Sequence, residues 1–125
     1  MKKKLLVPIL SVVAMLGITV LVYGKSFKDD YQYPNGYKME YYQVYTDVAT
    51  GATTSTENPA KAYVGIFIYD NDKSIVNSNF NEEKGYIKLV VTGKGDYSVS
   101  YHSLKDYQGT PLGERRSLDS RYFPN

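Results

Sequence analysis

The stretch YIKLVVTGKGDYSVSYHSL, residues 86–104, carries the clearest strand pattern in this chain of 125 residues. Apolar residues alternate before Gly93-Lys94-Gly95, and tyrosine and valine alternate after it. A period of two is typical of a half-buried β-strand, and a three-residue loop that ends in glycine favours a β-hairpin. A register with Thr92 opposite Asp96 places the large apolar side chains of both arms on one face. The sequence therefore predicts a hairpin here as the folding core.

Two upstream segments also have strand patterns. Residues 37–46 alternate between a tyrosine-rich face and a more polar face. Residues 62–69 are hydrophobic on both faces, which favours a central strand. No helical period is sustained after residue 24, and turn signals recur about every ten residues. We expect an all-β fold, a small antiparallel β-sandwich or barrel, preceded by an N-terminal hydrophobic export helix.

The polar stretches are interpreted as spacers and loops around a β domain that spans residues 37–104. Residues 25–36 are expected to be a spacer, and residues 49–60 a long surface loop with at most a frayed edge strand. A short returning strand is expected at residues 74–76. Residues 105–125 are expected to form a polar C-terminal tail that could add a last edge strand near residues 117–123.

The N-terminus has the pattern of an export segment. Three lysines precede 19 uncharged residues, 5–23, and a helix of that length spans about 28 Å, close to the hydrocarbon thickness of a bilayer. The charge asymmetry predicts that the chain after Lys25 is exported. Two fates stay open for residues 1–24. Cleavage after Gly24 would give a secreted chain, whereas retention would anchor the protein at the cell surface, with residues 5–23 as its only membrane contact.

Composition and motif spacing narrow the classes of function. The absence of cysteine excludes disulfide frameworks and thiol nucleophiles. Without the three N-terminal lysines, twelve basic residues face thirteen acidic ones, so we expect no nucleic-acid partner. His102, the only histidine, is expected on a solvated face opposite Tyr86. Asp70 and Asp72 begin like a calcium loop but lack its later ligands, and hydrolase motifs are absent. We therefore expect no enzyme activity, no cofactor and no bound metal.

Tyrosine is the distinctive residue type, with 14 in the chain. A tyrosine ring can bury its apolar body while its hydroxyl stays in water. Tyr97 and Tyr101 are expected in the core. Two other rows would form an aromatic platform for sugar rings or a protein partner if they were adjacent, and the alternative is that both rows belong to the core. The candidate binding residues are Tyr37, Tyr41, Tyr45, Tyr63, Phe67 and Tyr69.

These observations favour a non-catalytic binding module that acts at, or is released from, a bacterial cell envelope. Its expected partner is an envelope glycan or a surface protein. The alternative is a secreted, bacteriocin-like antimicrobial or toxin-type β protein. Retention of the N-terminal segment would favour the display module, and a free chain that inhibits related cells would favour the antimicrobial.

Overall fold

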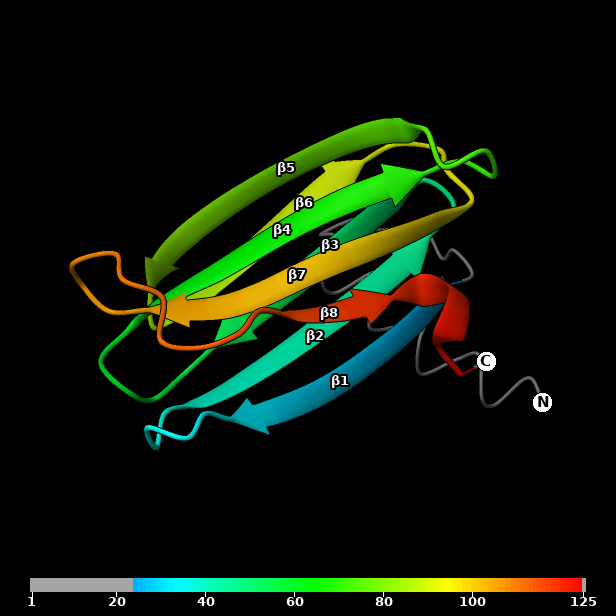
Figure 1. Cartoon of the computed structure of the whole chain (residues 1–125). Coiled ribbons are helices and arrows are strands. Elements are labelled where there is room, and N and C mark those ends of the chain that lie inside the picture. The colour runs from blue at the N-terminus through cyan, green and yellow to red at the C-terminus, as the bar shows by residue number, and fades with distance from the viewer. Residues whose placement is uncertain (1–23, 125) are drawn as a thin grey trace.

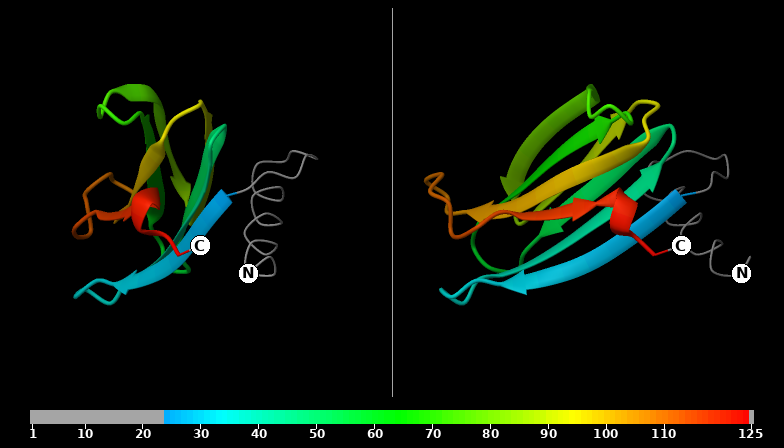
Figure 2. Two further views of the ribbon diagram at one scale, coloured as in Figure 1. Left: turned by 90° about the vertical axis from the view of Figure 1, so that its right-hand side faces the viewer. Right: turned by 45° about the vertical axis from the view of Figure 1, so that its right-hand side comes forward.

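The computed structural model describes residues 24–124, which form two four-stranded antiparallel sheets packed face to face (Figures 1 and 2). The first sheet has the order β1-β2-β3-β6 and the second the order β5-β4-β7-β8. A short 3-10 helix, η1 (Ser120–Tyr122), follows the last strand. The strands are β1 (Gly24–Gln32), β2 (Lys38–Thr46), β3 (Ala49–Ser55), β4 (Lys61–Tyr69), β5 (Ile75–Lys84), β6 (Tyr86–Thr92), β7 (Tyr97–Lys105) and β8 (Arg116–Asp119).

The prediction of an all-β fold with antiparallel sheets is confirmed for this part of the chain. The export helix expected within residues 1–24 lies outside the described residues, apart from Gly24. No helix between residues 24 and 124 is both long and apolar enough to cross a membrane.

Strand β4 supplies the centre of the core. Ala62, Val64, Ile66 and Ile68 alternate along one face of this strand and are buried against the first sheet. β4 lies between β5 and β7, so the expected central strand at residues 62–69 is confirmed.

The predicted hairpin over residues 86–104 is wrong. β6 pairs with β3, whereas β7 pairs with β4 and β8, so the two arms belong to different sheets. Residues 93–96 cross from one sheet to the other. Gly95 does not adopt a left-handed conformation, but a Cβ there would lie 2.8 Å from the Tyr69 carbonyl oxygen. Glycine is therefore required because the crossing passes close to the end of β4.

The face of β7 that points into the core is also the opposite of the predicted face. His102 is fully buried, so its expected position on a solvated face opposite Tyr86 is wrong. The inward residues of β7 are mostly polar, and they are Ser98, Ser100, His102 and Leu104.

A chain of hydrogen bonds crosses the core and joins the two sheets. Its members come from β2 and β3 on one side and from β7 on the other, and all are fully buried. Successive polar atoms lie 2.7 to 2.9 Å apart. Because each group finds a partner, the cost of burying polar side chains is largely offset. The members are Gln43, Thr50, Thr54, Ser98, Ser100 and His102.

Several stretches expected to be irregular or short are regular strands. The spacer at residues 25–36 contains most of β1, and the loop at residues 49–60 contains β3. The returning strand expected at residues 74–76 is the ten-residue β5. The last strand, β8, begins one residue earlier than the strand expected at residues 117–123 and ends at Asp119, where η1 follows. β1 and β5 are edge strands with one neighbour each, and much of their length is exposed. Little burial means little hydrophobic alternation, which is why their sequences resemble loops.

Candidate binding face

The two tyrosine rows predicted as candidates lie in different sheets. Tyr41 points into the core with 2% of its surface exposed, and its ring centroid lies 5.0 Å from that of His102. The half-buried Tyr45 donates a hydrogen bond from its hydroxyl to the Gly95 carbonyl, 2.8 Å away. Tyr37 packs partly buried against the core just before β2. The first row therefore does not adjoin the second.

The second row lies on the outer face of the second sheet. Along β4, the aliphatic residues are buried, and Tyr63, Phe67 and Tyr69 alternate with them at half-buried positions. The Tyr63 hydroxyl occupies the space over Gly65, because a Cβ at Gly65 would lie only 2.8 Å from that hydroxyl. This row is not part of the core.

Its neighbours are Tyr97 and Tyr101 of β7, both of which the sequence predicted to lie in the core. Tyr97 is indeed buried, with 7% of its surface exposed, but it is covered by Tyr69 and Arg121 on this outer face, whereas Tyr101 is half-buried. The register places Tyr69 opposite Tyr97 and Gly65 opposite Tyr101. The Tyr69 and Tyr97 rings stack with centroids 5.1 Å apart, and the Phe67 and Tyr101 rings meet edge to face at 5.8 Å. Burial beside these rings raises the pKa of Tyr69, which stays a neutral hydroxyl near neutral pH.

Strand β5 extends this surface on the other side of β4. Phe80 lies opposite Gly65, is 68% exposed, and has its ring centroid 6.2 Å from that of Tyr63. An exposed phenylalanine on a sheet face leaves apolar area in water without a covering group. We call this surface the aromatic face, and it comprises Tyr63, Phe67, Tyr69, Phe80, Tyr97 and Tyr101.

Cations lie over several of these rings. The Arg121 guanidinium carbon is 4.0 Å from the centroid of Tyr97. The Lys105 ammonium is 5.3 Å from the ring of Tyr63, and Arg115 also lies within 6 Å of that ring. Such distances are within the range of cation–π attraction. The aromatic face therefore combines ring surfaces with positive charge.

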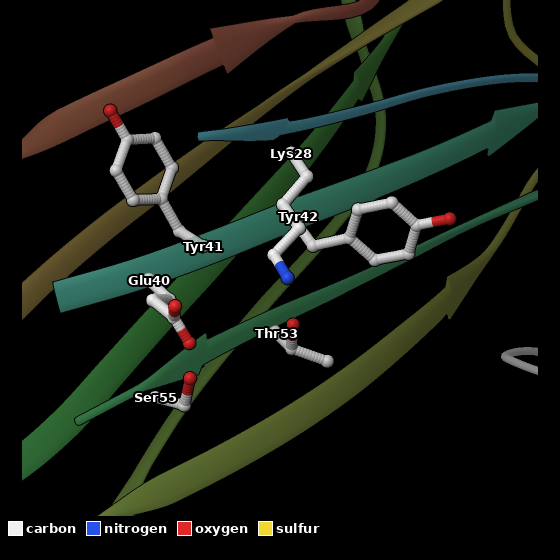
Figure 3. A pocket seen from close by; sticks show the side chains of 6 residues that line it. All are labelled: Lys28, Glu40, Tyr41, Tyr42, Thr53 and Ser55. Atoms are coloured by element: carbon white, nitrogen blue, oxygen red, sulfur yellow. The ribbon is translucent and has the colours of Figure 1, made fainter. Parts of the chain in front are cut away.

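A different hollow, of about 270 Å³, lies on the first sheet (Figure 3). Figure 3 shows the side chains of Lys28, Glu40 and Tyr42 around it, while the Tyr41 ring points away to the other side of β2. Thr53 and Ser55 complete the lining with hydroxyls. Within residues 24–124, no three histidine or acidic side chains gather in a way that could hold a metal ion.

No protein-family model, no curated protein and no solved structure matches this chain.

Sequence reasoning found half of the aromatic face and missed the other half. It missed Phe80 because the β5 segment was expected to be irregular, and Tyr97 and Tyr101 because the hairpin register placed them inside. One signal could have indicated Tyr97 and Tyr101: each carries a hydroxyl that would need a buried partner in a core.

Proposed function

We propose that this chain is a non-catalytic binding module exported to the bacterial cell envelope, where its aromatic face binds an envelope glycan. The observation that carries the proposal is the outward placement of aromatic rings from three adjacent strands, β5, β4 and β7. The core already has its own rings, Tyr33 and Tyr41, between the sheets.

The shape of this surface favours a polymer over a small molecule. Small-molecule sites are usually concave and bury most of the ligand, whereas a sheet face is broad and open. Rows of rings on such a face can contact the apolar faces of successive sugars. The half-buried Tyr63, Tyr69 and Tyr101 combine such a ring with a hydroxyl that can form hydrogen bonds.

The proposed export depends on the N-terminal sequence, and both of its fates are compatible with binding. Gly24 is the first residue of β1, and Lys25 already pairs with Tyr45 of β2. Cleavage after Gly24 would remove only the first residue of β1 and would leave the whole aromatic face in the released chain. Retention would present the same face from an anchored protein.

Co-sedimentation of the full-length chain with isolated bacterial cell walls tests the proposal. The double variant Tyr63→Ser/Phe80→Ser should bind at least about tenfold more weakly, because two ring contacts are lost. The matched control is Tyr86→Ser, which removes a 52% exposed ring from β6 in the first sheet. The control should bind normally, and both variants should still unfold cooperatively, with the double variant losing no more than about 2 kcal/mol of stability. Unchanged binding of the stable double variant would contradict the proposal.

A further inference from the structure

One end of the aromatic face carries an arginine with no acidic partner. The guanidinium carbon of Arg115 lies 5.9 Å from the ring centroid of Tyr63 and 5.5 Å from that of Tyr101. Arg115 is exposed, and among residues 24–124 no carboxylate forms an ion pair with it. Its charge and its hydrogen-bond donors are therefore available to a ligand that lies on the two rings.

The neighbouring arginines differ from Arg115 in this respect. Arg116 pairs with Glu114 at 3.1 Å, and Arg121 pairs with Asp119 at the other end of the face. The positive charge of those two side chains is already neutralised locally. Arg115 precedes both of them along the chain and forms no ion pair among residues 24–124.

The surroundings of the Tyr63 ring add to this positive charge. Lys61 and Lys105 share one carboxylate, Glu82, at 4.0 and 3.1 Å. Three cations, including Arg115, thus face one carboxylate here, which leaves two positive charges in excess. An anionic group would be attracted to this end of the aromatic face rather than to the Arg121 end.

Resting on the proposed function, we infer that the surface formed by Tyr63, Tyr101, Lys105 and Arg115 is a subsite for a hexuronate residue of an acidic polysaccharide. A hexuronate combines a pyranose ring, which can lie against the aromatic rings, with a carboxylate attached to that ring. Arginine presents a planar fork of donors that matches a carboxylate in two parallel hydrogen bonds. A polyol phosphate would supply the negative charge but no ring face.

Binding of the full-length chain to immobilised polygalacturonate tests the inference, with its methyl ester as a matched probe. Esterification keeps the sugar rings and removes the charge. The unaltered chain should bind the acid about tenfold more tightly than the ester, because charge-assisted hydrogen bonds are lost. Arg115→Gln should remove most of this preference, because it weakens binding of the acid much more than binding of the ester. The control Lys88→Gln removes one exposed charge from β6 in the first sheet and should keep the preference.

Three results would overturn the inference. The first is equal affinity of the unaltered chain for acid and ester, or no binding to the acid. The second is an undiminished preference in Arg115→Gln. The third is equally tight binding of polyglycerol phosphate, which would indicate charge attraction without ring contact. Failure of the proposed function has a separate signature, because Tyr63→Ser/Phe80→Ser would then co-sediment with bacterial cell walls as well as the unaltered chain does.

Discussion

Mild acid should destabilise this fold through His102, the buried imidazole in the hydrogen-bond chain between the sheets. Its Nδ1 lies 2.8 Å from the Thr54 hydroxyl and its Nε2 lies 2.7 Å from the Ser100 hydroxyl. Burial lowers the pKa of His102 from 6.5 to about 3, and a hydrogen bond to the Thr53 backbone offsets only part of that shift. The ring is therefore mainly neutral in the folded protein at pH 4.5 and above.

The unfolded chain, by contrast, protonates this imidazole below about pH 6.5. Because the unfolded state then binds a proton that the folded state does not, the free energy of unfolding falls as the pH falls from about 6.5 to about 3. Between pH 6.5 and 4.5 the loss due to His102 is about 2 kcal/mol, with a slope that approaches about 1.4 kcal/mol per pH unit.

Urea unfolding of the native chain and of His102→Gln at pH 6.5, 5.5 and 4.5 measures this effect. Glutamine keeps a donor and an acceptor but does not titrate. Carboxylates titrate in both proteins and affect both equally. We therefore subtract the unfolding free energy of the variant from that of the native chain at each pH, and the change of this difference with pH reports on His102. From pH 6.5 to pH 4.5 the native chain should lose about 2 kcal/mol more stability than His102→Gln does. Parallel pH curves would refute the reasoning, since they would mean that His102 keeps an ordinary pKa in the folded protein.

Three further predictions concern folding and processing. Gly95→Ala should cost at least about 2 kcal/mol in thermal melts, because its Cβ would crowd the Tyr69 carbonyl; a neutral substitution would contradict the crossing between sheets. Ile66→Ala, at a fully buried position, should cost about 2 to 5 kcal/mol, whereas Leu89→Ala, at a half-buried one, should cost about 1 to 2 kcal/mol; the reverse order would contradict the assigned core. Intact-mass analysis of material secreted by the cells that make it should show a chain beginning at Lys25 or Ser26, and a mass that retains residues 1–24 would instead establish an anchor.

The sequence predicted which segments of the molecule are β-strands better than it predicted which strands pair with one another. The two hydrophobic faces of residues 62–69 correctly indicated a central strand, because both faces of β4 do contact other side chains. Alternation shows which residues share a face, but not which strand lies alongside. The arms of the expected hairpin therefore have the predicted strand character and the wrong neighbours.

The face of β7 could not be predicted from β7 alone. Tyr97, Val99 and Tyr101 are larger and more apolar than the serines between them, so hydrophobicity favours placing them inside. Ser98, Ser100 and His102 are inside because Gln43 and two threonines of the first sheet, 48 to 57 positions away along the chain, provide their hydrogen-bond partners. This reversal of β7 also places Tyr97 and Tyr101 on the outer face of the second sheet, where Tyr97 is buried beneath its neighbours and Tyr101 is half-buried.

The most direct test of the binding face is hydroxyl-radical footprinting of the full-length chain with and without isolated cell-wall polysaccharide, because it reports on individual aromatic side chains. Phe80 and Tyr101 should lose reactivity when the polysaccharide is present, since both lie on the aromatic face. Tyr86, exposed on β6 of the first sheet, should keep its reactivity. Protection of Tyr86 with Phe80 and Tyr101 unchanged would place the contact on the other sheet and contradict the proposal.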